Sequence, residues 1–207
     1  MALVNKINIP TKKESESLIN EARTLNNGKW IEHSINTGVA ASIIASHTDD
    51  LDPDTCYIMG LLHDIGRRFG KMQLSHTIKG YNFMQSLGYS DIARINITHT
   101  FPIKDIDIIV AKWDCDESEV LFVKKYLDSI DTYDDYDRLI QLADYLSLHN
   151  GFTILEKRMV DIGFRYGVCE KTLIKWKELF KLKEYFDKKI DKNIYRLLPD
   201  IDKTTFG

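Results

Sequence analysis

The sequence predicts an all-α fold, and three observations lead to that class. The 207 residues include only four prolines, so long uninterrupted helices are allowed almost everywhere. Apolar residues recur at spacings of three and four, the period of a helix with one buried face. Hydrophobic residues make up 43% of the chain and charged residues 29%, the balance of a soluble globular protein.

A series of helices separated by turn residues is predicted from the N-terminus onward. The third helix follows Asp52-Pro53, because proline favours the first helical turn, and it is almost wholly apolar, which predicts burial on all sides. Residues 106–113 are rich in β-branched side chains, and helix and strand both stay open there. The predicted helices cover residues 12–26, 29–47, 55–65, 77–86, 91–98, 118–129, 136–148, 153–166 and 169–189.

Turn residues support the ends of these helices. Asn26-Asn27-Gly28 closes the first helix with residues that tolerate positive φ, and Gly66, Gly88 and Asn150-Gly151 follow later helices. No repeat and no low-complexity linker divides the chain. We therefore expect one domain over residues 1–207, consistent with its length.

Charge, cysteine content and hydropathy exclude several classes of protein. Lys and Arg number 28 against 31 Asp and Glu, so the net charge of −3 lacks the basic footprint of a nucleic-acid-binding protein. The three cysteines are far apart, which disfavours both a disulfide framework and a thiolate zinc site. Residues 1–10 lack the long apolar run of a signal peptide, and no run approaches the roughly 20 apolar residues of a membrane span. We expect a cytoplasmic protein without nucleic-acid or membrane partners.

The doublet His63-Asp64 ends the apolar segment and carries the strongest chemical signal. A carboxylate at the end of a buried helix must be desolvated, and it faces the negative end of the helix dipole. A bound cation removes both objections. Neutral imidazole and carboxylate are ligands that suit manganese, iron, zinc and magnesium ions.

Further ligands must come from other helices. His33 lies on a helix with an apolar face, Asp144 is flanked by apolar residues, and His76 and His99 each precede a threonine. Taken singly, a histidine such as His33 is more often a hydrogen-bonded core residue, and an aspartate such as Asp144 is usually solvated or ion-paired. The combination of the doublet with these residues favours a metal centre.

The order of these residues resembles the HD-domain superfamily of metal-dependent phosphohydrolases. The segment Gly60-Leu-Leu-His-Asp-Ile-Gly66 is similar to the signature helix end of that superfamily, and Leu142-Ala-Asp-Tyr-Leu146 is similar to the segment that carries its last aspartate. The similarity covers most of residues 29–150. It implies an HD-type helical bundle with a metal-binding core at 29–150 and additional C-terminal helices at 151–207.

His76 and His99 match two further histidines, which mark the branch of the superfamily that holds two metals. That branch includes bacterial diadenosine tetraphosphate hydrolases of the HD type. The residues after Gly151 do not match this group, which leaves the substrate open. The Gly-Tyr-Pro motif of cyclic-di-GMP phosphodiesterases is absent, since Gly80-Tyr81 is followed by Asn82.

The resemblance implies two divalent ions, iron, manganese or another transition metal, with magnesium also compatible. It further implies hydrolysis of a phosphate ester or anhydride by attack of a metal-bound hydroxide, with Asp64 bridging the ions. The implied ligands are His33, His63, Asp64 and Asp144 for one ion, and Asp64, His76 and His99 for the other.

Arg67, Arg68 and Lys71 directly follow the doublet and are predicted to bind substrate phosphate, since arginine binds phosphate bidentately. The alternative is a solvated basic turn. Arg67 is counted with Asp64 as a predicted catalytic residue. Together with the bound ions, these side chains predict a positive phosphate-docking region in a chain that is negative as a whole.

The expected function is that of a metal-dependent phosphohydrolase acting on a nucleotide or dinucleoside polyphosphate, as a phosphomonoesterase, a phosphodiesterase or a dinucleoside polyphosphate hydrolase. One alternative is a non-catalytic nucleotide-binding HD signalling module, and another is a helical domain with a stabilising metal. Two roles stay open for residues 151–207, which cap the domain or form the face of a homodimer.

Overall fold

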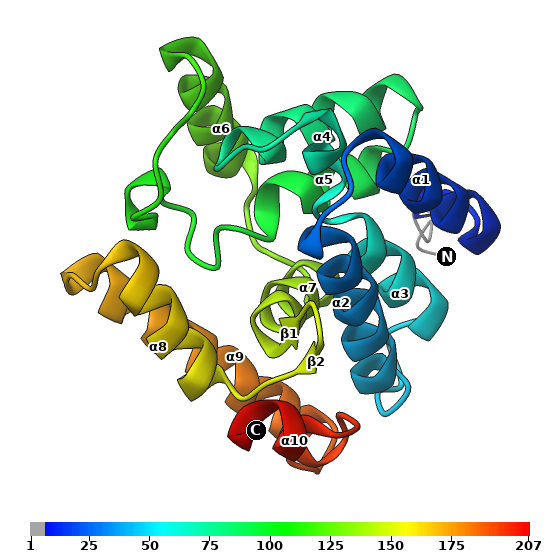
Figure 1. Cartoon of the computed structure of the whole chain (residues 1–207), viewed down its shortest axis with the longest axis vertical. Helices are drawn as coiled ribbons and strands as arrows, with labels where there is room; N and C mark the ends of the chain where they lie inside the picture. The colour runs from blue at the N-terminus through cyan, green and yellow to red at the C-terminus, as the bar shows by residue number, and fades with distance from the viewer. Residues whose placement is uncertain (1–6) are drawn as a thin grey trace.

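The computed structural model describes residues 7–207, and apart from one two-stranded hairpin the regular secondary structure of this part is helical (Figure 1), which confirms the predicted all-α fold. The elements are α1 (Lys12–Leu25), α2 (Lys29–Ala45), α3 (Pro53–Leu62), the 3-10 helix η1 (Ile65–Phe69), α4 (Ser75–Ser86), α5 (Ser90–Thr98), the 3-10 helix η2 (Ile106–Ile108), α6 (Glu117–Ser129), α7 (Asp135–Leu146), β1 (Ser147–Leu148), β2 (Gly151–Phe152), α8 (Leu155–Tyr166), α9 (Glu170–Lys189), the 3-10 helix η3 (Ile194–Arg196) and α10 (Ile201–Phe206).

Side-chain caps explain where several helices begin. Asp52 accepts a hydrogen bond from the backbone N–H of Thr55 and, with proline at the next position, starts α3. Asp116 and Asp134 cap α6 and α7 in the same way, each with an acidic residue three positions later that completes a capping box. These local signals place the helix starts within about two residues of those predicted.

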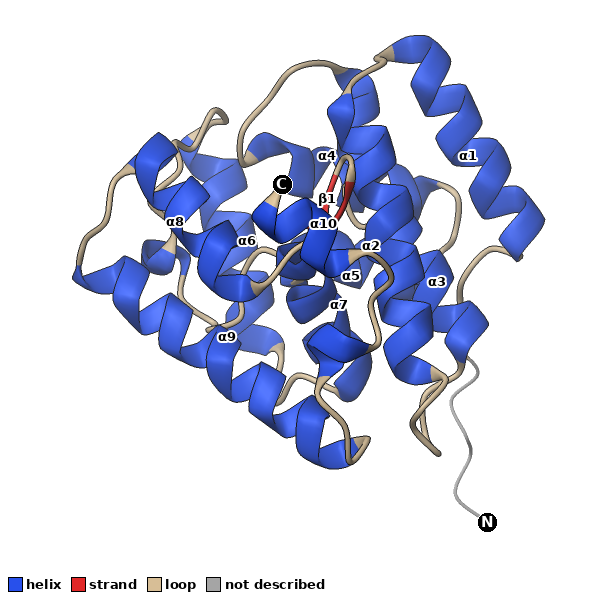
Figure 2. Cartoon of the chain, turned by 60° about the horizontal axis from the view of Figure 1, so that its bottom comes forward, coloured by secondary structure: helices blue, strands red, loops and turns tan. Residues whose placement is uncertain are grey.

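Helix α7 lies at the centre of the molecule, with α1 to α5 on one side and α8 and α9 on the other (Figures 1 and 2). One cluster of buried apolar side chains extends across this arrangement, and it includes Ile31 of α2, Leu142 of α7, Met159 of α8 and Phe186 of α9. The residues after 150 therefore bury their apolar faces against the same core as the residues before it.

The helices α2 and α3 approach each other closely because glycines face one another where they meet. A Cβ atom added at Gly60 would lie 2.7 Å from the Cα of Gly38, and one added at Gly38 would lie 2.7 Å from the carbonyl oxygen of Tyr57. No side chain fits between the two backbones at this point. This contact sets the distance between His33 on α2 and His63 at the end of α3.

Three details differ from the sequence prediction. The helix α7 ends at Leu146 rather than at 148, because Ser147 and Leu148 pair with Phe152 and Gly151 in a short hairpin. Gly151 has a φ of 135°, which allows the turn. The helix α3 ends at Leu62 rather than at 65, and α10 lies after the last predicted helix. In the β-branched segment, where helix and strand were both open, the structure has the short η2.

Residues 1–6 lie outside the described part of the chain, so the expectation that residues 1–10 are not a signal peptide concerns mostly undescribed residues. Within residues 7–207, no helix combines the length and apolarity needed to cross a bilayer.

The glycine contact between α2 and α3 yields a stability prediction. Replacing Gly60 with Ala should lower the free energy of unfolding by about 1–3 kcal/mol, because the new methyl group forces the two helices apart. Urea denaturation followed by circular dichroism measures the change. Gly163→Ala in α8 is the matched control, since its methyl group meets only the side chains of Val168 and Trp176. A Gly60→Ala protein as stable as wild type would contradict the close approach.

Candidate metal centre

Five elements bring the six predicted ligands to one place. His33 comes from α2 and Asp144 from the last turn of α7. His63 and His99 are the first residues after α3 and α5, where the chain leaves the helix and the side chain is free to point along its axis. Asp64 follows His63, and His76 lies in the first turn of α4. The site is therefore assembled from helix ends that meet beside α7.

The first group of ligand atoms surrounds Asp144. Its Oδ1 atom lies 2.9 Å from Nε2 of His33 and 3.8 Å from Nε2 of His63. Oδ2 of Asp64 lies 3.9 Å from Nε2 of the same His63. One potential ligand atom each from His33, His63 and Asp64 falls within 4.8 Å of the other two. These distances suit ligands that converge on one ion.

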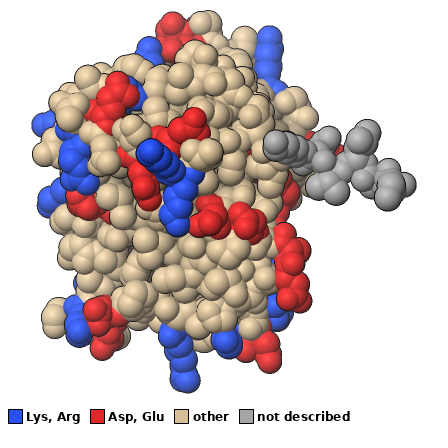
Figure 3. All heavy atoms as spheres, turned by 90° about the vertical axis from the view of Figure 1, so that its right-hand side faces the viewer, with Lys and Arg blue, Asp and Glu red and all other residues tan. Residues whose placement is uncertain are grey.

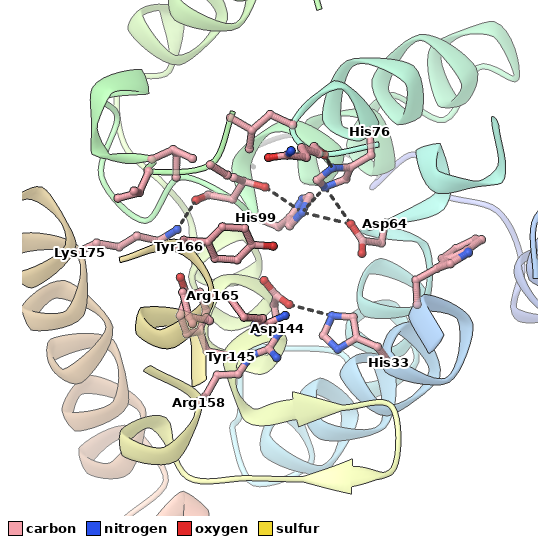
Figure 4. Close-up of a pocket in the computed structure, with 18 of the residues that line it drawn as sticks. His33, Asp64, His76, His99, Asp144, Tyr145, Arg158, Arg165, Tyr166 and Lys175 are labelled. Atoms are coloured by element: carbon pink, nitrogen blue, oxygen red, sulfur yellow. Dashed lines mark hydrogen bonds and ion pairs between the residues drawn. The ribbon is translucent and has the colours of Figure 1, made fainter. Parts of the chain in front are cut away.

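The second group shares Asp64. Its Oδ1 atom lies 2.9 Å from Nε2 of His76 and 3.7 Å from Nε2 of His99, and the two Nε2 atoms are 3.4 Å apart. Figure 4 shows these three side chains pointing toward one another above the Asp144–His33 pair. Because Asp64 faces one group with each carboxylate oxygen, it can bridge two ions, as the sequence analysis expects.

Backbone carbonyls orient all four histidine rings. Nδ1 of His33 lies 3.1 Å from the carbonyl of Ser147, and Nδ1 of His63 and His99 lies 2.7 and 3.0 Å from carbonyls of their own helices. Nδ1 of His76 makes the equivalent contact with a carbonyl of the preceding turn. Since a carbonyl only accepts hydrogen bonds, each Nδ1 carries a proton and each Nε2 faces the site. Metal-binding histidines are held in this way.

The donor set fits a divalent transition metal, and two features of the described residues would be stabilised by a bound cation. Nε2 of His63 is buried and has no hydrogen-bond partner in residues 7–207. The Nε2 atoms of His76 and His99 face each other at 3.4 Å, where two lone pairs repel unless a positive charge lies between them. Imidazole nitrogens with carboxylate oxygens are the ligands expected for iron, manganese or zinc.

The electrostatics of the site keep its groups in the protonation states that bind metals. Burial lowers the pKa of His99 to about 3 and also lowers the pKa of His63, so both rings are neutral at pH 7. Burial opposes ionisation of Asp64 and Asp144, but the Arg67 guanidinium beside Asp64 and the contact of His33 with Asp144 outweigh it, so both pKa values are lowered. The carboxylates therefore stay charged in a buried place.

The three predicted phosphate-binding residues have different positions. Arg67 lines the cavity above the site, and its Nε donates to Oδ2 of Asp64 at 2.6 Å. Arg68 instead points away, pairs with Glu21 at 2.9 Å and stacks on Phe83. Lys71 is exposed and does not line the cavity. The structure thus brings Arg67 to the cavity but not Arg68 or Lys71, because Arg67 and Arg68 point in different directions from the short helix η1 and Lys71 follows its end.

A cavity of about 470 Å³ opens above the ligands, a size that accommodates a small molecule. Its far wall comes from α8 and α9, which contribute Arg158, Arg165, Tyr166, Lys175 and Trp176. Sequence analysis missed these residues. A signal existed, since Arg158 and Arg165 are seven positions apart and hence share a helix face. However, nothing in the sequence indicates that this face meets the metal centre.

Comparison with known proteins is decisive for the family. The HD domain model matches residues 30–148, more than half of the chain. The chain belongs to the HD domain family. The matched region contains all six predicted ligands of this HD protein, and the family indicates the superfamily of metal-dependent phosphohydrolases, whose members bind divalent ions. Searches of curated proteins and of solved structures found no match. Closer similarity to diadenosine tetraphosphate hydrolases stays a prediction. The helices α8 and α9 lie outside the matched region, and their expected role as an extension of the HD core also stays a prediction.

The shared carboxylate yields a prediction about metal content. Elemental analysis of the purified protein should find two ions per chain. His33→Ala should lower the content to one ion by removing a ligand of the first group, and His76→Ala should do the same for the second. Asp64→Ala should lose both, because each group depends on this carboxylate.

His47→Ala is the matched control, since that ring bonds to the carbonyl of Ile43 outside the site. A content of one ion per chain in the wild type, unchanged in His76→Ala and His99→Ala, would refute the two-ion arrangement.

Proposed function

We propose that this HD protein is a metal-dependent phosphohydrolase that cleaves a phosphate ester or anhydride of a nucleotide. One observation carries the proposal. Six predicted metal-ligand side chains form two groups around a shared, buried Asp64, and all of them except His63 line a cavity that admits a small molecule. A purely structural metal site is normally closed by its protein ligands, whereas a catalytic one opens toward substrate.

Divalent ions held by these residues would supply Lewis-acid chemistry, activating water and neutralising the charge of the phosphoryl group. The side chains of the protein have complementary tasks. The four backbone-oriented histidines and the two ionised carboxylates hold the ligand atoms in place before substrate arrives. This pre-organisation avoids rearrangement during the reaction.

Arg67 has a separate task. Its Nε donates a hydrogen bond to Oδ2 of Asp64 at 2.6 Å, and one NH group donates to the carbonyl of Met72. These two bonds fix the guanidinium beside the predicted metal ligands. The pairing with Asp64 outweighs burial and raises the pKa of Arg67, so the group stays charged. A phosphoryl oxygen above Asp64 would find the remaining N–H groups of Arg67 within the cavity.

The aromatic side chains that line the cavity favour a nucleotide over a simple phosphate ester. Trp30 lies beside His33, and Tyr145 follows Asp144, so both flank the first ligand group. Rings at such positions can stack on a base. Of the other aromatic residues near the predicted ligands, Phe101 is fully buried in a separate apolar cluster and Phe69 is exposed outside the cavity.

A substrate screen tests the proposal. Protein loaded separately with manganese, iron, cobalt, nickel or magnesium ions should release phosphate or nucleotide from at least one member of a panel of nucleoside mono- and polyphosphates and diadenosine polyphosphates. Chelator should abolish turnover. Asp64→Asn should lower the rate by about 100- to 1,000-fold or more, because it weakens both ligand groups.

The same experiment separates the alternatives. His47→Ala should retain the wild-type rate, as it lies outside the site. Tight nucleotide binding without turnover under any metal would favour a signalling module. Loss of helicity in Asp64→Asn, followed by circular dichroism, would favour a metal that only stabilises the fold. An enzyme should lose activity and keep its helices.

A further inference from the structure

The wall of the cavity opposite the metal ligands is formed by the two helices that lie outside the HD match. In Figure 4, Arg158, Arg165 and Lys175 are on one side, and His33, Asp64 and His76 are on the other. On α8, Arg158 and Arg165 are seven residues apart and share a face. On α9, Lys175 lines the cavity with its neighbour Trp176. Two helices thus direct cationic side chains toward one space.

These three cations have no carboxylate partner among the described residues. Nε of Arg158 is buried and has no hydrogen-bond partner in residues 7–207. Arg165 donates from Nε only to a backbone carbonyl of its own helix, at 3.2 Å. Lys175 donates to the carbonyl of Thr100 at 3.1 Å and lies 5.3 Å from the ring centroid of Tyr145. Arg158 and Lys175 are half-buried rather than in bulk water, and three cations that line one cavity without a carboxylate partner in residues 7–207 point to an anionic ligand.

The charge of the whole cavity supports the same conclusion. Its described lining contains two carboxylates, both of them predicted metal ligands, and a larger set of cations: Lys29, Arg67, Arg158, Arg165 and Lys175. The chain as a whole carries a net charge of −3. On the face of the molecule in Figure 3, cationic and anionic side chains are interspersed. Positive charge is therefore concentrated in the cavity, and bound metal ions would add to it.

One phosphoryl group does not account for so many cations. A scissile phosphate at the metal centre would already meet the ions and Arg67, which is fixed beside Asp64. The α8–α9 side chains approach from the opposite wall, where they would contact a different part of the ligand. Guanidinium and ammonium groups without carboxylate partners bind phosphoryl oxygens well.

We propose that Arg158, Arg165 and Lys175 form a second anion subsite, which binds a phosphoryl group of the substrate other than the one that is cleaved. This inference rests on the proposed function and narrows it to substrates with at least two phosphoryl groups. The C-terminal helices thereby determine substrate class, while the HD core carries the metal ligands.

Binding measurements on the full chain test the subsite without relying on turnover. Isothermal titration calorimetry compares AMP with two probes that carry more than one phosphoryl group, adenosine 3′,5′-bisphosphate and ATP. The titrations are made in chelator, where hydrolysis is excluded, and again with manganese. Wild-type protein should bind at least one of the two probes more tightly than AMP in one of these conditions.

The double variant Arg158→Gln/Arg165→Gln should lose about 10- to 100-fold in affinity for the preferred probe, with a much smaller change for AMP. Lys175→Gln should act in the same direction. Arg165→Gln alone changes an exposed side chain, so it keeps the test valid if the double variant fails to fold. Lys177→Ala is the matched control on α9, because Lys177 is exposed and does not line the cavity.

The subsite is refuted if wild type shows no preference over AMP in either condition, or if the Arg165 and Lys175 variants retain it fully. Failure of the proposed function has a different signature. In that case wild type turns over no substrate with any metal, yet the calorimetric preference and its loss in the variants remain.

Discussion

The buried Asp64 carboxylate is the constraint on which the rest of the structure depends. Its residue is only 4% exposed, and it sits where the chain leaves a buried helix, so both desolvation and the helix dipole oppose its charge. The structure compensates with positive or polarisable groups on every side, namely Arg67 and the imidazoles of His63, His76 and His99. Such an arrangement is costly as a purely structural device, and a bound cation would stabilise it.

The scaffold holds these side chains through helix packing and through hydrogen bonds that leave the Nε2 atoms of the histidines facing the site. Glycines let α2 and α3 touch, and backbone carbonyls fix the histidine rings. A second buried carboxylate, Asp137 of α7, accepts hydrogen bonds from Arg94 at 3.0 Å and from the Thr98 hydroxyl at 2.7 Å. That network ties the end of α5, which carries His99, to α7, which carries Asp144. The ligands thus have positions set by packing and hydrogen bonds.

The two parts of the chain contribute differently to the cavity. The residues matched by the HD family supply the floor, with predicted metal ligands and Arg67. The helices α8 and α9 share the apolar core with the HD part, and they line the opposite wall with aromatic rings and with cations that have no carboxylate partner in residues 7–207. With this division, changes to the wall would leave the ligand geometry intact.

The sequence by itself determined the helical fold and the identity of the ligand candidates. Capping residues such as Asp52 and Asp134 act locally, and the His63-Asp64 doublet is unusual within its own helix, so both are visible without tertiary information. Local sequence signals did not reveal that the Arg68 side chain points away from the cavity. The direction of a side chain on a short helix depends on what packs around it, here Phe83 and Glu21. Local sequence signals also did not predict the hairpin that ends α7, because the hairpin depends on strand pairing across a turn. Only the tertiary structure decided that Arg158, Arg165 and Lys175 face the metal centre. These residues lie far from the ligands along the chain, and their proximity results from the burial of α8 and α9 against the common core.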